Sequence, residues 1–182
     1  MAIISTYTDE QREFVCRALT IVGQRREHTG RVEVRHYPTP WPDLSYPATA
    51  LYVDGDCAMT TMPEDLLDHR SILEEAEGSV LLTGLGLGVG VSFALANQEV
   101  IKVTVVEKDG EVIDAIWPLF KDEARAEVIH VDADTFEPDE AFDFAYLDHR
   151  VLGDVPQESK DYFRARIPVV KVWAEEREAQ CL

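Results

Sequence analysis

Residues 79–90 read Ser-Val-Leu-Leu-Thr-Gly-Leu-Gly-Leu-Gly-Val-Gly, and this stretch decides the fold. Its first part, Val80 to Thr83, is a short and largely apolar run, which is typical of a strand that is covered on both faces. Glycines then stand at alternate positions from Gly84 to Gly90, and a short helix is expected from about Val89 to Ala96. Glycine lets a backbone turn sharply and approach a ligand closely, and the start of a helix offers unpaired N–H groups. The stretch therefore predicts a strand, a ligand-binding turn and a helix.

The segments after this turn alternate between strand and helix. Further strands are expected over Ile101 to Val106, Glu127 to Val131 and Phe142 to Leu147, and a second helix over Glu111 to Phe120. This alternation predicts an α/β fold with a Rossmann-like, doubly wound and mostly parallel sheet. The tail has room for a fifth strand between Tyr162 and Val172 and little room for more, so we expect the sheet to be truncated at its C-terminal end.

The first 78 residues show a different pattern of expected secondary structure. An amphipathic helix is expected to begin near Thr8, because apolar residues recur every four positions after it. Asp54-Gly55 lies between two strand-like runs, which predicts a β-hairpin, and a helix with Pro63 near its start follows. We therefore expect residues 1–78 to form a small N-terminal helix, a β-hairpin and a helix. Residues 79–182 are expected to form the Rossmann-like nucleoside-binding domain, within one compact unit.

Composition and charge narrow the classes of function. The chain has 182 residues, of which 46% are hydrophobic, so it can bury a core of its own. Its formal net charge of -18 opposes the binding of nucleic-acid phosphates and of anionic lipid. No apolar run approaches the ~20 residues that span a bilayer, and the N-terminus does not resemble a signal peptide. Three widely spaced cysteines fit neither a disulfide framework nor a zinc site. We expect a cytoplasmic protein without a metal site and without nucleic-acid or membrane partners.

The spacing of the glycines indicates which ligand the turn binds. Dinucleotide sites use the pattern G-x-G-x-x-G, and no register of this turn supplies it. Gly84-x-Gly86-x-Gly88 has instead the spacing found in S-adenosylmethionine binders. Glu107 ends the second strand, 19 residues after Gly88, where a carboxylate can accept hydrogen bonds from both hydroxyls of a ribose. The alternative for Glu107 is a solvated acid at the end of a strand.

Two motifs and the hairpin before them carry a resemblance to a known family. Val80-Leu-Leu-Thr-Gly-Leu-Gly-Leu-Gly and Val103-Thr-Val-Val-Glu-Lys-Asp resemble motifs of class I methyltransferases and, more narrowly, of spermidine synthases. Leu51-Tyr-Val-Asp-Gly-Asp-Cys-Ala-Met-Thr, followed by an acidic helix that carries His69, is similar to the hairpin and helix before the spermidine-synthase nucleotide domain. The resemblance covers about Leu51 to Asp148, a little over half of the chain.

The resemblance implies a set of donor-binding residues. The donor is S-adenosylmethionine or its decarboxylated form, and the residues that would hold it are Gly84, Leu85, Gly86, Gly88, Glu107, Asp132 and Ala133. Within this set, Asp132 would hold the amino group of the adenine. Asp134 is a neighbour that could take this role instead.

The resemblance also implies catalytic residues. Asp148 ends the fourth strand, where an acid in aminopropyltransferases helps to deprotonate the attacking amine. His149 follows it, so that an acid–base pair at one strand end is one interpretation. A histidine on a surface loop is the alternative for His149.

Three positions depart from the family. Spermidine synthases place an acid inside the glycine loop, where this chain has Leu87, and a glutamine in the hairpin, where it has Ala58. Methyltransferases often place an acid two residues before the first loop glycine, where this chain has Leu82. The usual partners of the donor's ammonium group are therefore missing. The acids that could replace them are Asp56, Glu64 and Asp148.

Three functions compete at this stage. The first is a small methyltransferase that uses S-adenosylmethionine and acts on an unknown small-molecule acceptor, for which the acidic chain favours a cationic compound. The second is an aminopropyltransferase, and the third is a non-catalytic binding or scaffold protein that keeps the fold. A homodimer through the N-terminal helix and hairpin is possible by analogy alone.

Overall fold

The computed structural model describes residues 29–38, 48–150 and 154–180. The helix expected near Thr8 lies outside the described residues. The N-terminal part forms a three-stranded antiparallel sheet whose strands are β1 (Val32–Tyr37), β2 (Ala48–Val53) and β3 (Asp56–Thr60). Asp54 and Gly55 turn between β2 and β3 with φ angles of 54° and 88°. The expected hairpin is confirmed, and β1 adds a third strand to it.

Helix α2 (Pro63–Leu73) leads into a second sheet of five strands. These strands are β4 (Gly78–Thr83), β5 (Val100–Glu107), β6 (Ala126–His130), β7 (Phe144–Leu147) and β8 (Val169–Val172). They lie in the order β6-β5-β4-β7-β8, and each neighbouring pair is parallel. The expected Rossmann-like sheet is confirmed, including its fifth strand.

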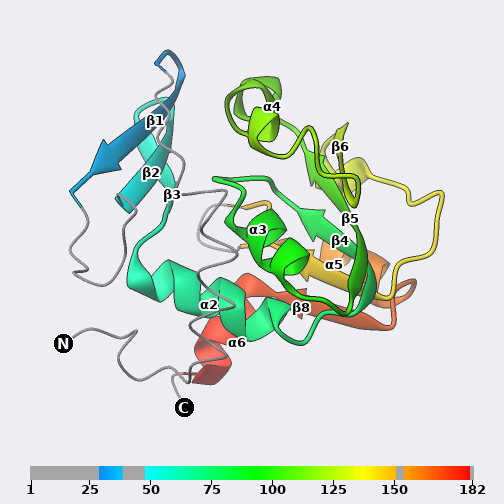
Figure 1. The fold of residues 1–182 in the computed structure, drawn as a ribbon. Helices are drawn as coiled ribbons and strands as arrows, with labels where there is room; N and C mark the ends of the chain where they lie inside the picture. The colour runs from blue at the N-terminus through cyan, green and yellow to red at the C-terminus, as the bar shows by residue number, and fades with distance from the viewer. Residues whose placement is uncertain (1–28, 39–47, 151–153, 181–182) are drawn as a thin grey trace.

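Helices cover both faces of the five-stranded sheet (Figure 1). They are α3 (Val89–Ala96), α4 (Gly110–Ile116), α5 (Gln157–Arg164) and α6 (Trp173–Gln180), with the short 3-10 turns η2 (Trp117–Leu119) and η3 (Ala133–Thr135). Val80 and Leu82 of β4 belong to one apolar cluster, together with residues of α2 and α3. Leu81 belongs to a second cluster that contains Phe163 of α5. Because β4 is covered on both sides, its sequence is apolar at successive positions.

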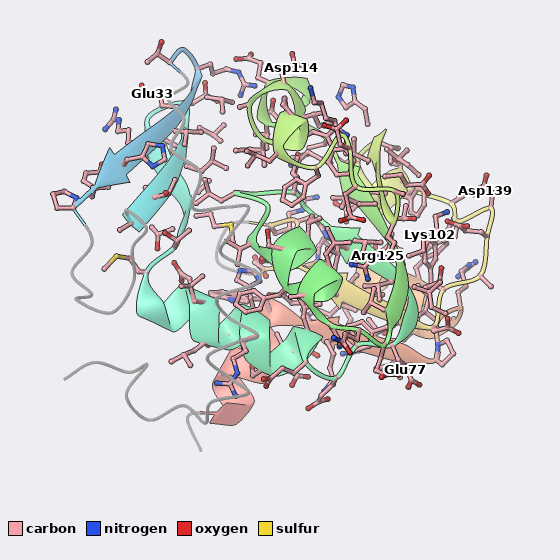
Figure 2. All side chains as sticks on the ribbon, in the orientation of Figure 1. Glu33, Glu77, Lys102, Asp114, Arg125 and Asp139 are labelled. Carbon is pink, nitrogen blue, oxygen red and sulfur yellow. The ribbon has the colours of Figure 1, made fainter. Side chains whose placement is uncertain are left out.

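One apolar cluster extends through both sheets. Val32 and Leu51 of the antiparallel sheet belong to the same cluster as Phe93 of α3. Charged side chains surround this core, as Glu33 and Asp139 show at opposite edges of the view in Figure 2. The division of the chain at residue 78 into two segments stays a prediction. Among the described residues, no helix has the length and the apolar composition needed to cross a membrane.

The second helix of the parallel-sheet region is shorter than expected. It was expected to reach Phe120, but α4 ends at Ile116, and η2 follows. Pro118 lies in η2, and a proline has no N–H group to donate to the preceding turn of an α-helix. The helix therefore tightens and ends before it reaches Phe120.

The order of the strands locates the candidate site. The chain starts the sheet at β4 in the middle, moves outward to β5 and β6, and then returns to β7 on the other side of β4. In open α/β sheets, ligands bind at the carboxyl ends of the strands where the winding reverses in this way. In this chain those ends carry Gly84, after β4, and Asp148, after β7.

Candidate functional site

The glycine turn after β4 has a backbone that other residues cannot adopt without strain. Gly84, Gly86 and Gly88 have φ angles of 92°, 50° and 79°. A Cβ atom at Gly84 would lie 2.6 Å from the carbonyl oxygen of Asp148. A Cβ atom at Gly88 would lie 2.5 Å from the ring of Phe120. These glycines are therefore required by both conformation and space.

Glu107 holds the turn from the end of β5. One of its carboxylate oxygens accepts a hydrogen bond from the Leu85 N–H (2.9 Å), and the other accepts one from the Asp109 N–H (2.8 Å). The side chain is buried, so the solvated strand-end acid is ruled out. A carboxylate can accept about four hydrogen bonds, and each oxygen therefore keeps a lone pair for a ribose hydroxyl. Its role in binding a ribose stays a prediction.

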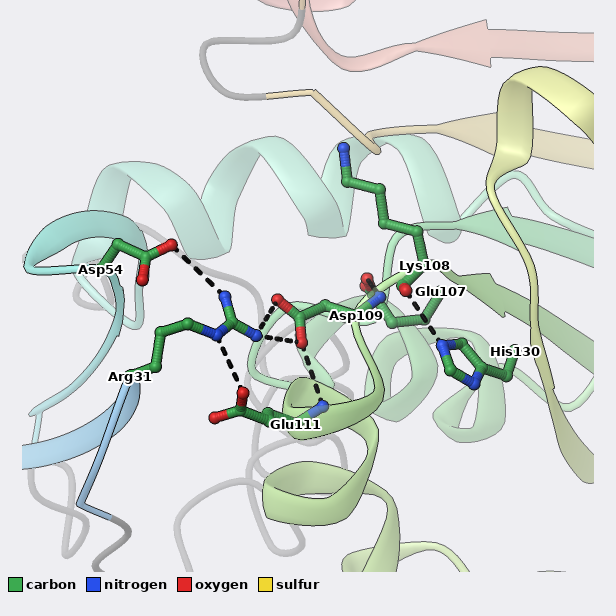
Figure 3. Close-up of polar contacts among 7 residues, drawn as sticks. All are labelled: Arg31, Asp54, Glu107, Lys108, Asp109, Glu111 and His130. Atoms are coloured by element: carbon green, nitrogen blue, oxygen red, sulfur yellow. Dashed lines mark hydrogen bonds and ion pairs between the residues drawn. The ribbon is translucent and has the colours of Figure 1, made fainter.

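Arg31 ties the antiparallel sheet to the beginning of α4 (Figure 3). Its guanidinium donates to both carboxylate oxygens of Asp109 (2.7 and 2.8 Å) and to Glu111 (2.9 Å). It also contacts Asp54 in the hairpin turn (3.4 Å). The hydrogen bonds that Arg31 donates to Asp109 and Glu111 raise its pKa, and the guanidinium is charged in any case. In the same view, the ammonium of Lys108 points away from this network. This role of Arg31 was not predicted from the sequence, because Asp109 and Glu111 lie 78 and 80 positions away.

Met59 of β3 reaches the glycine turn from the other side. Its sulfur accepts a hydrogen bond from the Leu87 N–H at 3.2 Å. It also lies 2.5 Å from the position that a Cβ atom at Gly86 would occupy. The hairpin therefore contacts the turn directly, and one of the turn's N–H groups is already engaged.

The residues proposed for the adenine lie after β6. Asp132 caps η3, where its carboxylate accepts a hydrogen bond from the Asp134 N–H (3.0 Å), and Ala133 is buried. Asp134 is engaged on the other side: it accepts hydrogen bonds from Ser159 (2.9 Å) and from Arg150. A pocket of about 400 Å³ opens beside them, lined by Asp134, Thr135, Phe136, Glu137, Pro156, Glu158, Ser159 and Tyr162. The adenine roles of Asp132 and Ala133 stay predictions.

Asp148 lies in a buried group of ionisable side chains. Its carboxylate lies 3.9 Å from Nε2 of His69, and Nδ1 of His69 is hydrogen bonded to the Tyr146 hydroxyl (3.1 Å). Burial, together with the nearby charges of Asp65 and Asp68, raises the pKa of Asp148 to about 8. Burial lowers the pKa of His69 to about 4. At neutral pH the imidazole is therefore neutral, and the Asp148 carboxyl group is mostly protonated.

His149 is packed inside the molecule. Nδ1 of its ring is hydrogen bonded to the Thr83 hydroxyl (2.7 Å), and Nε2 to Asp134 (3.1 Å). Only 7% of the side chain is exposed, and burial lowers its pKa. The structure therefore excludes the exposed loop histidine, and both ring nitrogens already have partners. A catalytic role for His149 stays a prediction, and its contacts favour a part in positioning the end of β7.

The grouping of ionisable residues around Asp148 was not predicted from the sequence. Two spacings could have revealed them. Tyr146 and Asp148 are two positions apart, which places them on one face of a strand. Asp65, Asp68 and His69 are three and four positions apart, which places them on one face of α2. What the sequence does not contain is the packing of α2 against the carboxyl end of β7.

Two of the three positions that depart from the family, Leu82 and Leu87, belong to the core. Leu82 and Leu87 are 2% and 0% exposed, so neither leaves space for a buried acid without repacking. Ala58 and Asp56 are exposed on β3. The side chain of Glu64 lies outside the described residues. The backbone carbonyl of Asp148 lies beside Gly84 of the glycine turn.

Comparison with known proteins gives a likeness of fold. No protein-family model and no curated protein matches the sequence. The spermidine synthase of Thermotoga maritima matches with a TM-score of 0.50 and 22% identity, over 77% of this chain and 51% of that one. A spermidine synthase bound to the transition-state analogue AdoDATO matches with a TM-score of 0.46 and 23% identity, over 68% and 46% of the two chains. A dimethyladenosine transferase from Plasmodium falciparum matches with a TM-score of 0.41 and 18% identity, over 57% and 36%. The chain thus spans about half the length of the Thermotoga maritima spermidine synthase, and over that part it has the Rossmann-like fold of this enzyme.

Proposed function

We propose that the protein binds S-adenosylmethionine and transfers its methyl group to a small, cationic amine. The observation that carries the proposal is the position of Asp148. Its carboxyl group lies at the switch point of the sheet, its backbone touches Gly84 of the turn, and its pKa is raised to about 8. A group with this pKa next to a ligand-binding turn is suited to take a proton near neutral pH.

The donor half of the site is supported by the turn and by Glu107. A ribose held by the free lone pairs of Glu107 would lie against Leu85, and the adenine would extend toward Asp132 and Ala133. In this arrangement the 5′ end of the nucleoside would point toward Gly84 and Asp148. The protein's main contribution would be positioning, because the sulfonium donor is already activated and in-line alignment supplies much of the rate.

The acceptor half is supported by its charge. The carboxylates of Asp65 and Asp68 act on Asp148 strongly enough to raise its pKa. An alkylammonium that enters this group replaces the repulsion by attraction, so that Asp148 ionises beside it. Asp148 then accepts one proton from the ammonium, and the freed nitrogen lone pair forms a bond to the methyl carbon. The bond between this carbon and the sulfonium breaks, and its electron pair stays on the sulfur.

Calorimetric titration separates this proposal from its competitors. The expected result is binding of both S-adenosylmethionine and its demethylated product. Preference for decarboxylated S-adenosylmethionine over both would indicate an aminopropyltransferase. If none of the three compounds binds, the transferase proposal is wrong, and a scaffold that keeps the fold remains.

Methyl transfer itself is tested by mass spectrometry with a panel of small primary and secondary amines. Asp148→Asn should lower the rate about 10²- to 10⁴-fold, the usual contribution of a general base, while donor binding is kept. Asp139→Asn removes a carboxylate from an exposed loop and is the matched control. Equal rates for the two variants would remove Asp148 from the reaction.

A further inference from the structure

Met59 lies against the glycine turn at Gly86 and Leu87. The side chain is partly buried and packs against the main apolar cluster. Its sulfur is bonded to the Leu87 N–H (3.2 Å) and covers the Cα face of Gly86. The thioether therefore fills the space above Gly86 and occupies a hydrogen-bond donor of the turn.

Residues at the two ends of the turn suggest how a nucleoside would be oriented. Glu107 accepts from the Leu85 N–H, so a ribose on Glu107 lies close to the beginning of the turn. Asp148 touches Gly84, so the 5′ carbon must approach that residue for a group to be transferred. With a nucleoside held in this way, the substituent that stays on its sulfur would extend along Gly86 and Leu87, where the sulfur of Met59 lies.

The residues of the turn at this position are apolar. Leu82, Leu85 and Leu87 are 2%, 3% and 0% exposed, and the remaining turn residues are glycines. The α-amino acid end of S-adenosylmethionine carries an ammonium and a carboxylate, and charged groups lose much hydration free energy when they are buried without partners. The residues of the turn itself, Gly84 to Gly88, offer them no charged side chain, and the Leu87 N–H is engaged by Met59.

We infer that Met59 makes the donor site selective for 5′-thioether nucleosides with a small, uncharged substituent on sulfur, over nucleosides that carry an amino acid chain there. The inference rests on the proposed function, because it assumes a nucleoside on Glu107. A small alkyl group packs beside the thioether of Met59 without moving it. An amino acid chain has to displace Met59 and break its hydrogen bond to the turn. Binding of S-adenosylmethionine therefore requires that the hydrogen bond between the Leu87 N–H and the Met59 sulfur is broken.

The test compares two ligands that differ only in the substituent. We would titrate 5′-methylthioadenosine and S-adenosylhomocysteine into the wild-type protein, Met59→Ala and Met62→Ala by calorimetry. In the wild type, 5′-methylthioadenosine should bind at least about tenfold more tightly. In Met59→Ala, this ratio should fall toward one, because space and the Leu87 N–H are released. Met62 is exposed just before α2, so Met62→Ala should keep the wild-type ratio.

The outcomes separate the inference from the function on which it rests. S-adenosylhomocysteine binding as tightly as 5′-methylthioadenosine to the wild type overturns the selectivity and leaves the nucleoside site in place. A ratio that is unchanged in a folded Met59→Ala protein also overturns it. If neither ligand binds to any of the proteins, both the inference and the proposed donor site are wrong. The wild-type ratio is decisive even if Met59→Ala does not fold, which a thermal melt would reveal.

Discussion

The two halves of the candidate site differ in the chemical groups that form them. The donor half consists of backbone: three glycines with positive φ angles, two N–H groups that donate to Glu107, and a third that donates to Met59. The acceptor half consists of side chains that titrate: His69 and Tyr146 are buried at the end of β7, and Asp148 beside them is partly buried. The donor half therefore depends on shape, and the acceptor half depends on charge. Changes of volume and changes of pH should separate them.

The largest effect is expected from Gly88→Ala in the donor half. The new Cβ atom would meet the ring of Phe120 at 2.5 Å in a left-handed conformation. Strain and overpacking together should lower the free energy of unfolding by about 3 kcal/mol, and nucleoside binding should be lost. Thermal and urea unfolding measure the first effect, and calorimetry measures the second.

Gly90→Ala is the matched control for this prediction. Gly90 lies inside α3, and the nearest atom to an added Cβ is 3.7 Å away. Alanine is favoured over glycine in a helix by about 1 kcal/mol, so stability should stay equal or rise. Equal losses at both positions would show that the donor half does not depend on the conformation of the turn.

The second effect is the pH dependence of stability, which belongs to the acceptor half. The pKa of Asp148 rises from 3.8 to about 8 on folding, so the folded state holds the proton more tightly. Its contribution is favourable at low pH and is lost as the pH rises from about 4 to about 8. A difference of one bound proton between the folded and the unfolded state changes the free energy of unfolding by about 1.4 kcal/mol per pH unit. We expect about half of this change, because the side chain of Asp148 is 26% exposed to solvent. Between pH 5 and 8 the loss should be about 2 kcal/mol.

Urea unfolding of the wild type and of Asp148→Asn at several pH values measures this term. The difference between the two proteins isolates Asp148, because His69 and His149 have lowered pKa values and lose stability in the opposite direction, as the pH falls. Asn cannot titrate, so the slope assigned to Asp148 should disappear. Parallel curves for the two proteins would contradict the charge-based description of this half.

The smallest effect is expected from Arg31→Ala, which removes the ion pairs between the antiparallel sheet and the beginning of α4. The ion pairs of Arg31 are exposed and screened by salt, so the fold should persist. Amide hydrogen exchange in β2 and β3 should become faster, because Met59 and the hairpin lose one of their anchors. Arg35→Ala is the control, since Arg35 pairs with Glu33 on its own strand. Identical exchange in both variants would show that the Arg31 network does not hold the hairpin on the donor half.

Much of the fold followed from local patterns. The apolar run of β4, the glycines after it and the Asp54-Gly55 turn each predicted the observed element, because strand burial and positive φ angles act over a few residues. The expected end of the second helix was wrong by four residues, since Pro118 limits the helix. The third strand of the antiparallel sheet was not assigned to the hairpin, because pairing of β1 with β2 depends on residues far apart in the chain.

The sequence by itself determined where a ligand-binding turn lies and which two strand ends flank it. Spacing carried this information, because glycine conformation and the winding of a parallel sheet follow from nearby residues. The tertiary structure alone decided what surrounds the turn: the sulfur of Met59 on Leu87, 28 positions away, and the ring of His69 on Tyr146, 77 positions away. It also decided the charge of Asp148, because a raised pKa arises from the removal of water, and burial belongs to the packed molecule rather than to the residue.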